Sequence, residues 1–277
     1  MGRLDDKVAI VTGATGAMGA TIARRLAAEG AGVVGVGRSV EAGQAVVEEI
    51  VARGGQAIFV PTDVSQEDQV ARAVDRTVEH FGGLQVIVNG AAPMRGDGTG
   101  APSAAIELTT EQFDWPVRVC LFGAFWMAKY GLGPMVASGG GAVVNLSSGA
   151  AARGVRRGGG YGPAKAALEA LGRGLAVDYG SAGVRVNTVR LGAISVPGNA
   201  ALHADPAFTA ALQDARIVPR EGTPEDVAAL VAFLASDESG FITGEVFVLD
   251  GGAAAKHRGV NFAEATAAAP PPPRSPA

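Results

Sequence analysis

The sequence has a single cysteine, Cys120, and three widely separated histidines, His80, His203 and His257. One cysteine excludes an internal disulfide, and the histidines do not have the spacing of metal ligands, so we expect no metal site. No apolar segment approaches the roughly 20 residues that a membrane-spanning helix needs, and residues 1–7 lack the apolar region of a signal peptide. From these features we expect a cytoplasmic protein with no membrane contact.

Basic residues are too few to form a large positive surface. The chain carries 23 Lys and Arg against 27 Asp and Glu, a formal net charge of −4. Such a surface would repel a polyanion, so no nucleic-acid partner is expected. The 277 residues, 48% of them hydrophobic, suffice for one substantial α/β core. We predict a single domain, residues 1–252, followed by an Ala- and Pro-rich tail, 253–277, that is disordered at its end.

Short Val- and Ile-rich runs alternate with longer helical patterns along the chain. The predicted strands are 7–12, 33–36, 56–60, 85–88, 142–146, 184–189 and 245–249. The predicted helices are 20–29, 40–53, 66–81, 110–136, 161–179 and 223–236, and segments 94–104, 149–160 and 193–219 are expected to be loops that shape the specificity of the site. This alternation predicts a Rossmann-like, doubly wound parallel sheet of about seven strands with helices on both faces and ligands at the carboxyl ends of the strands.

A glycine-rich turn, Thr12-Gly13-Ala14-Thr15-Gly16-Ala17-Met18-Gly19, follows the first strand and leads into the first helix. Glycines let the backbone approach a pyrophosphate, and a helix N-terminus directs N–H groups at it, although a plain tight connection has the same pattern. The second strand ends at Gly37-Arg38, where an NAD site has an acid that holds the ribose 2′-hydroxyl. A guanidinium pairs with a 2′-phosphate, so NADP is favoured over NAD; a solvated arginine is the alternative.

Tyr161 and Lys165 are four residues apart in a predicted helix, so they lie on one face. The pKa of a free tyrosine is about 10, and it must fall to about 7 for proton exchange at neutral pH. One ammonium about 4 Å away, at an effective dielectric constant near ~20, supplies the roughly 4 kcal/mol required. Ser148 can hydrogen-bond the same substrate oxygen. A packed aromatic residue beside a solvated lysine is the competing interpretation.

Taken together, these residues resemble the classical short-chain dehydrogenase/reductase family over about residues 4–252. The supporting motifs are the turn at Thr12-Gly13, Asp63-Val64, Asn89, Ser148 with Tyr161-xxx-Lys165, Arg185-Val186-Asn187, Ile242-Thr243-Gly244 and Asp250-Gly251-Gly252. The resemblance implies hydride transfer between a nicotinamide cofactor, NADP or NAD, and an alcohol or ketone carbon. Tyr161 would be the acid/base, Lys165 would lower its pKa and hold the nicotinamide ribose, and Ser148 would orient the substrate oxygen.

The resemblance also implies a set of cofactor contacts. Asp63 would contact the adenine, Asn89 would brace the central strand, and backbone near Ile194 would meet the carboxamide. The expected cofactor-binding residues are Gly13, Thr15, Gly16, Ala17, Met18, Gly19, Arg38, Asp63, Val64, Asn89, Gly90, Ala91, Tyr161, Lys165, Gly192, Ile194 and Ser195.

Several positions depart from the family pattern. Gly16 and Ala17 give the glycine turn the spacing of the extended, epimerase-like branch of the family. Gly90 and Ala92 after Asn89 also differ from the family motif. Leu191 replaces a proline, and Val196, beside Ser195, replaces a threonine. Cys120 stands where the family has an asparagine that relays protons from Lys165 to solvent through a water. A thiol is a weak donor and cannot copy an amide; the alternative is a small buried residue with no role in the reaction.

Two other functions stay open: a cofactor-binding protein with little catalysis, and an isomerase or dehydratase that reuses the cofactor. Arg153, Arg156 and Arg157 lie between Ser148 and Tyr161, where they would meet an anionic substrate, stay solvated or pair across subunits. The helices starting at 110 and 161 are apolar on more than one face, and by analogy with the family we expect a homo-oligomer, a tetramer or a dimer.

Overall fold

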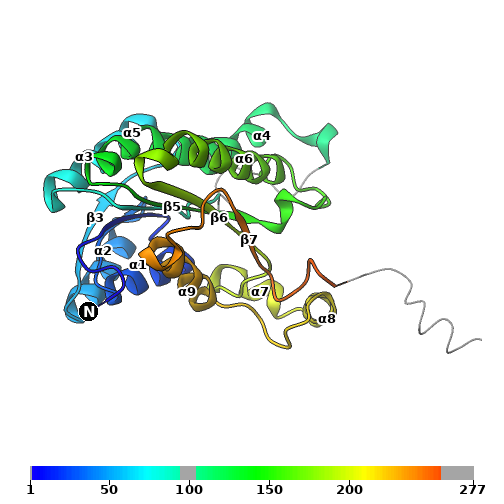
Figure 1. Ribbon diagram of the computed structural model, residues 1–277. Helices are drawn as coiled ribbons and strands as arrows, with labels where there is room; N and C mark the ends of the chain where they lie inside the picture. The colour runs from blue at the N-terminus through cyan, green and yellow to red at the C-terminus, as the bar shows by residue number, and fades with distance from the viewer. Residues whose placement is uncertain (1, 94–103, 257–277) are drawn as a thin grey trace, which may run out of the picture.

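A computed structural model describes residues 2–93 and 104–256, and it contains one seven-stranded sheet with helices on both faces (Figure 1). All strands are parallel, in the order β3-β2-β1-β4-β5-β6-β7. The strands are β1 (Val8–Thr12), β2 (Gly32–Gly37), β3 (Gln56–Pro61), β4 (Val86–Asn89), β5 (Gly141–Ser148), β6 (Val184–Leu191) and β7 (Val246–Leu249). The predicted Rossmann-like fold is confirmed.

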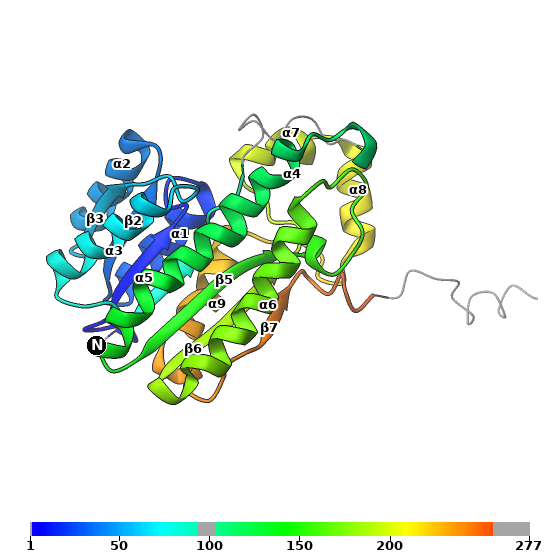
Figure 2. The same cartoon turned by 90° about the horizontal axis from the view of Figure 1, so that it is seen from above.

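Helices cover the two faces of the sheet in two groups (Figure 2). One group comprises α1 (Ala17–Ala28), α2 (Val40–Ala52) and α9 (Pro224–Ala235), and the other comprises α3 (Glu67–Phe81), α5 (Gly123–Ala137) and α6 (Tyr161–Tyr179). Each group packs apolar side chains on the sheet, which gives two separate cores. Because both faces are covered, the strands are continuous apolar runs such as the fully buried Val8–Thr12.

The strand order reverses between β1 and β4, and this reversal opens a crevice at their carboxyl ends. Thr12, the last residue of β1, is aligned with Asn89, the last residue of β4. The Thr12 hydroxyl donates to the carbonyl of Val88 (3.3 Å) and accepts from the N–H groups of Gly90 (3.0 Å) and Ala91 (3.2 Å). One side chain therefore holds the chain that leaves β4 against the end of β1.

The predicted helix 110–136 is a continuous helical segment that contains one irregular turn. It comprises α4 (Thr110–Val117), a π-helical turn (Arg118–Phe122) and α5. Gly131 lies within α5, where a Cβ would stand 2.6 Å from Ile87 Cδ1, so this glycine allows close helix–sheet packing.

The expectation that no segment is long and apolar enough to span a membrane also needs correction. The segment Thr110–Ala137 has 28 residues, and its most apolar window has a mean hydropathy of 1.3. Of that window, 56% is buried in the fold.

Two more predictions of local structure were wrong. Helix α1 begins at Ala17, not at residue 20, so it starts directly after Gly16. The segment 193–219 is not only loop, since it contains α7 (Ala200–His203) and α8 (Pro206–Ala215). The Asp205 carboxylate caps α8 by accepting from the N–H of Ala207 (2.9 Å), and an Asp-Pro pair is a helix-start signal that could have been read. The predicted loop 94–104 lies outside the described residues except for Ala104, which precedes a short 3₁₀ turn (Ala105–Glu107).

The start of the predicted tail is part of the fold. Residues 253–256 form turns, in which the N–H of Ala254 donates to the Asp250 carboxylate (2.7 Å) and the Lys256 ammonium donates to the carbonyl of Asp214 near the end of α8. The predicted disorder at the end of the tail concerns residues outside the described part of the chain.

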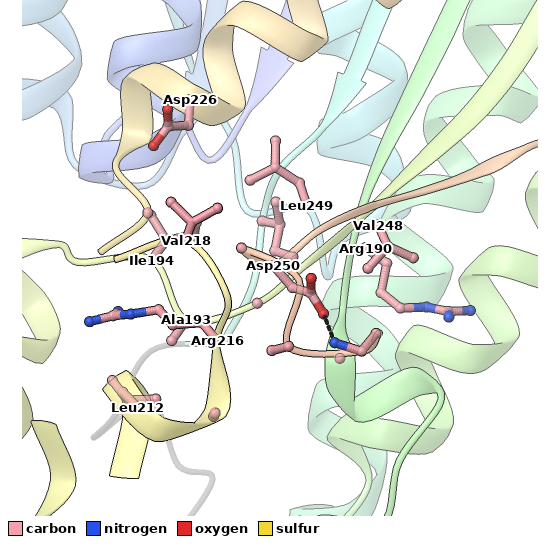
Figure 3. Close-up of a pocket in the computed structure, with 18 of the residues that line it drawn as sticks. Arg190, Ala193, Ile194, Leu212, Arg216, Val218, Asp226, Val248, Leu249 and Asp250 are labelled. Carbon is pink, nitrogen blue, oxygen red and sulfur yellow. Dashed lines mark hydrogen bonds between the residues drawn. The ribbon is translucent and has the colours of Figure 1, made fainter. Parts of the chain in front are cut away.

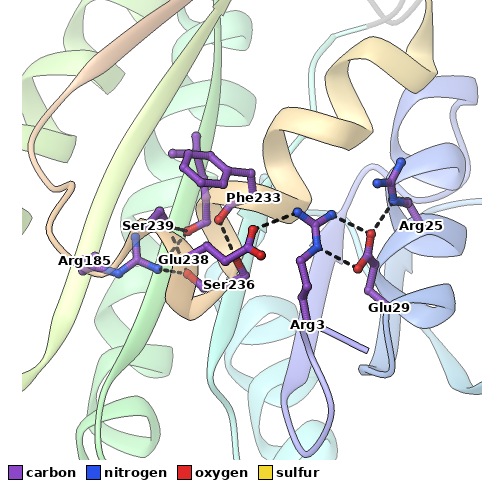
Figure 4. Close-up of polar contacts among 9 residues, drawn as sticks. Arg3, Arg25, Glu29, Arg185, Phe233, Ser236, Glu238 and Ser239 are labelled. Atoms are coloured by element: carbon purple, nitrogen blue, oxygen red, sulfur yellow. Dashed lines mark hydrogen bonds and ion pairs between the residues drawn. The ribbon is translucent and has the colours of Figure 1, made fainter. Parts of the chain in front are cut away.

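Ion pairs fasten the N-terminal segment to the α1–α9 side (Figure 4). The Arg3 guanidinium donates two hydrogen bonds to the Glu29 carboxylate (2.9 and 2.6 Å) and one to Glu238 (3.1 Å). Arg25 also donates to Glu29 (2.8 Å). These hydrogen bonds hold the pKa of Glu29 down at about 2. Arg185 of β6 donates to two carbonyls at the end of α9, and so ties this network to the sheet.

Candidate active site

The glycine-rich turn and the start of α1 form a cradle at the crevice between β1 and β4. Gly13 has φ +75°, and at Gly19 a Cβ would stand only 2.2 Å from the carbonyl oxygen of Gly13, so both positions need glycine. Gly16 is the N-cap of α1, with no side-chain cap, and the first turn has no acidic residue. The N–H groups of this 12-residue helix therefore present positive potential to the crevice, as a phosphate requires.

A cavity of about 300 Å³ lies over this cradle. Its lining includes most of the predicted cofactor contacts, namely Gly13, Thr15, Gly16, Ala17, Met18, Gly19, Arg38, Asp63, Val64, Gly90 and Ala91. Asp63 is held in place because its carboxylate accepts from the N–H of Ser65 (2.9 Å) and its own N–H donates to Gln69 (2.8 Å). The residues present thus fit an elongated, phosphate-bearing nucleotide.

Asn89 is buried at the end of β4, directly opposite Asn145 of β5. Its amide donates to the side-chain oxygen of Asn145 (2.8 Å), whereas the Asn89 oxygen and the Asn145 amide nitrogen have no partner among the described residues. Asn89 therefore links two central strands and does not line the cavity over the cradle.

Ser148 ends β5, and Tyr161 and Lys165 lie in the first two turns of α6, which packs against β5. Tyr161 is the first residue of α6, and the Lys165 Nζ lies 5.7 Å from the centre of its ring. Lys165 is buried, and its ammonium donates to the carbonyl of Leu146 (2.7 Å). Ser148, the last residue of β5, is half-buried, and its Oγ accepts from the N–H of Ala150 (3.3 Å). This arrangement places a phenol, an ammonium and a hydroxyl at one strand end.

Cys120 lies within the π-helical turn between α4 and α5, and its side chain is buried beside Lys165. Burial raises the pKa of the thiol, and the nearby ammonium only partly offsets this. Burial works against the charged form of Lys165, but the charges that Cys120 and Tyr161 bear when deprotonated raise its pKa overall. Both shifts favour the same state at neutral pH, an ammonium beside a neutral thiol, so Cys120 is a weak donor with little thiolate character.

The chain beyond β6 takes a course that the sequence did not predict. Leu191 has the N–H that a proline lacks, and it is the last residue of β6, aligned with Ser148. Ile194 forms an isolated bridge with Gly222, and the N–H of Ser195 donates to the Gly222 carbonyl (2.9 Å). Gly192 and Ile194 line a second cavity and not the cavity over the cradle. From this part of the chain, the cavity over the cradle is lined by Val196 and Gly198, and Ser195 is not in its lining.

That second cavity, of about 440 Å³, adjoins the site at Gly149, the residue after Ser148 (Figure 3). Its walls are partly apolar, with Leu212 and Val218 among them, and Arg153 at its edge lies 3.8 Å from Asp250. Arg153 also lines a shallower cavity that includes Tyr161. In residues 2–93 and 104–256, no three His, Cys, Asp or Glu side chains converge as metal ligands.

Sequence reasoning missed a polar cluster behind Lys165, in which the buried Ser147 and Glu169 meet the partly exposed Arg190. The Glu169 carboxylate accepts from Ser147 Oγ (2.8 Å) and from both Nε (2.8 Å) and Nη2 (2.5 Å) of Arg190. The available signal was that Glu169 follows Lys165 by four residues and so shares its helix face.

A family model described as enoyl-(acyl carrier protein) reductase matches residues 13–254. Among curated proteins, the cis-4-hydroxycyclohexanecarboxylate dehydrogenase of Sinomonas cyclohexanicum is 38% identical over 248 residues, which are 89% of this chain and 96% of that protein. The cyclohexanol dehydrogenase of Acinetobacter sp. (strain SE19) is 34% identical over 254 residues, or 90% of this chain and 95% of the relative.

Solved structures show the same likeness. A short-chain type dehydrogenase/reductase from Mycobacterium ulcerans superposes with a TM-score of 0.86 at 32% identity, covering 95% of this chain and 94% of its own. A gluconate 5-dehydrogenase from Burkholderia cenocepacia J2315, solved in complex with NADP and tartrate, has a TM-score of 0.85 at 27% identity and covers 92% and 98% of the two chains.

Proposed function

The chain belongs to the short-chain dehydrogenase/reductase family, and we propose that Tyr161, Lys165 and Ser148 are its catalytic residues and NADP its preferred cofactor. The reaction of the family, nicotinamide-dependent hydride transfer on an alcohol or ketone, is the reaction of this enzyme. The observation that carries the residue assignment is that Lys165 Nζ lies 5.7 Å from the Tyr161 ring and binds β5 at Leu146, two residues before Ser148, at the same sheet edge as the uncapped start of α1.

The nicotinamide supplies the hydride acceptor or donor when it is bound. The α1 N-terminus would bind the pyrophosphate, Asp63 and Val64 would flank the adenine, and Lys165 would hold the nicotinamide ribose. The α1 N-terminus, Asp63 and Val64 are open to the cavity, since they line it and α1 has no capping side chain.

Tyr161 carries the proton of the reaction. During alcohol oxidation its phenolate oxygen takes the hydroxyl proton, and during ketone reduction the phenol returns it to the carbonyl oxygen. Ser148 donates a hydrogen bond to that oxygen, and Lys165 stabilises the phenolate by its positive charge. The Lys165 ammonium donates one hydrogen bond to the carbonyl of Leu146, and the Cys120 thiol is a second partner.

The preference for NADP rests on the end of β2. Gly37 occupies the place of the expected acid, and Arg38 lines the cavity next to it. Arg38 precedes Ser39, the N-cap of α2, whose Oγ accepts from the N–H of Ala42 (3.3 Å). A guanidinium and a helix N-terminus side by side favour a 2′-phosphate. The NADP-bound gluconate 5-dehydrogenase supports this choice.

The substrate class that we infer is a small cyclic alcohol or its ketone. Two relatives act, by their names, on alcohols of a six-membered ring, one of which bears a carboxylate. A partly apolar cavity beside Gly149 suits such a ring, and Arg153 at its edge suits a carboxylate. The test is NADPH formation from cyclohexanol, 4-hydroxycyclohexanecarboxylate and linear alcohols of equal carbon number. Faster turnover of the linear alcohols would refute the ring preference, and absence of turnover throughout would refute the catalytic assignment.

We also propose a homo-oligomer. The segment Thr110–Ala137 exposes Phe113, Phe122, Phe125 and Val136, each about two-fifths accessible. Aromatic side chains spaced along one helical segment are typical of subunit interfaces. Analytical ultracentrifugation at micromolar protein concentration tests this, and a purely monomeric species would contradict it.

A further inference from the structure

Glu169 lies at the centre of the buried cluster behind the catalytic residues. Its side chain is only 6% exposed, and each carboxylate oxygen accepts at least one hydrogen bond. Burial alone would raise the pKa of Glu169, but the hydrogen bonds from Arg190 and Ser147 outweigh burial and lower it. The carboxylate is therefore ionised at neutral pH and fully engaged.

The three members of the cluster come from the three elements that carry the site. Glu169 is one helical turn after Lys165 in α6. Ser147 directly precedes Ser148 in β5, and its Oγ also lies 3.4 Å from the carbonyl oxygen of Lys165.

Arg190 precedes Leu191 and Gly192, where β6 ends beside Ser148. Figure 3 shows its side chain directed away from Asp250. A fork of two hydrogen bonds fixes both the distance and the angle between two groups, which a single contact does not.

We propose that Glu169 is a positioning residue, which clamps α6 to the ends of β5 and β6 through Ser147 and Arg190 and so sets the mutual placement of Lys165, Ser148 and Gly192. This inference rests on the proposed function, because it assigns an effect on catalysis. Stability alone does not explain the cluster, since a buried ion pair is often replaced by apolar side chains without loss of stability. Reacting groups, in contrast, lose much of their rate when displaced by a fraction of an ångström to one ångström.

The test uses the full-length chain and a matched control. Glu169→Gln keeps the shape of the side chain and removes its charge, and Arg190→Lys keeps the charge and removes the fork. The control is Glu29→Gln, because Glu29 accepts the same kind of fork from Arg3 outside the site. A double variant, Glu169→Met with Arg190→Met, replaces the pair by apolar side chains and serves if the single variant does not fold.

The measurements are kcat and KM for the best alcohol, and the dissociation constant of NADPH from its fluorescence without substrate. In Glu169→Gln and in the double variant, kcat should fall by about 10- to 100-fold while KM for the alcohol stays within about twofold. The NADPH dissociation constant should rise by about fivefold, because Lys165 is displaced from the ribose. Arg190→Lys should retain more of the wild-type kcat than Glu169→Gln does, because it keeps the charge. Glu29→Gln should leave kcat, KM and the NADPH dissociation constant unchanged.

A folded Glu169→Gln or double variant with wild-type kcat and wild-type NADPH affinity would overturn the proposal. Equal losses in Glu169→Gln and in Glu29→Gln would also overturn it, because they would indicate a general loss of stability. If the wild-type chain binds NADPH but converts no alcohol or ketone, the proposed function fails; the NADPH dissociation constants then still decide whether Glu169 positions Lys165.

Discussion

The ammonium of Lys165 donates a 2.7 Å hydrogen bond to the carbonyl oxygen of Leu146, two residues before Ser148. This contact joins α6 to β5 immediately behind the reacting groups. It also satisfies one of the three donors of this buried ammonium with a backbone carbonyl.

Tyr161→Phe should lower kcat by about 10³-fold, because it removes the group that exchanges the proton with substrate. The matched control is Tyr179→Phe at the other end of α6, which should retain wild-type turnover. Cofactor reduction with cyclohexanol or the best alcohol of the panel measures both. Unchanged turnover in Tyr161→Phe would favour the alternative of a cofactor-binding protein with little catalysis.

Cys120→Asn should raise kcat by about two- to tenfold, because an amide donates and accepts hydrogen bonds where a neutral thiol does so weakly. It should also change the pH profile of kcat, since the raised pKa of the thiol prevents Cys120 from exchanging protons near neutral pH. The control is Cys120→Ala, which should not raise kcat. If Cys120→Asn alters neither turnover nor the pH profile, the buried residue has no part in proton relay.

Arg38→Ala should raise KM for NADP by about 10- to 100-fold, the loss expected for a charge-assisted pair with a phosphate, and should leave KM for NAD nearly unchanged. Steady-state kinetics with both cofactors measures the ratio. Arg53→Ala, at the far end of α2, is the control. An equal rise in KM for NAD and for NADP would show that Arg38 does not bind the 2′-phosphate.

Glu29→Gln should lower the free energy of unfolding at pH 7 by about 2 kcal/mol, because Glu29 accepts charge-assisted hydrogen bonds from Arg3 and Arg25. The pKa of Glu29 is about 2 in the fold, against an ordinary value of 4.5. A lowered pKa stabilises the fold above pH 4.5, and this contribution is lost as pH falls from 4.5 towards 2.

Urea unfolding of wild type and Glu29→Gln between pH 7 and pH 2.5 measures this loss. The two curves should converge at the acidic end. The exposed Glu48→Gln serves as control and should shift stability by less than about 0.5 kcal/mol. A wild-type advantage that persists undiminished at pH 2.5 would contradict the assignment.

The sequence was informative wherever the signal is local. Strand ends were predicted to within a few residues because parallel strands buried on both faces are short, continuous apolar runs. The start of α1 was placed three residues late, because Gly16 caps the helix without a polar side chain. The helix α8 was missed although Asp205 and Pro206 mark its start. These errors concern element boundaries and two short helices, α7 and α8, and they leave the topology intact.

By itself, the sequence determined the alternation of strands and helices, the glycine turn, and the helical spacing of Tyr161 and Lys165, because each depends on residues close together in the chain. Only the tertiary structure decided that Glu169 pairs with Arg190 across α6 and β6, that Cys120 sits in a π-helical turn beside Lys165, and that Ile194 faces another cavity than Val196. These relationships depend on how far apart packed elements lie and which way their ends turn. Side-chain volumes across the whole core set those distances, and no spacing along the chain encodes them.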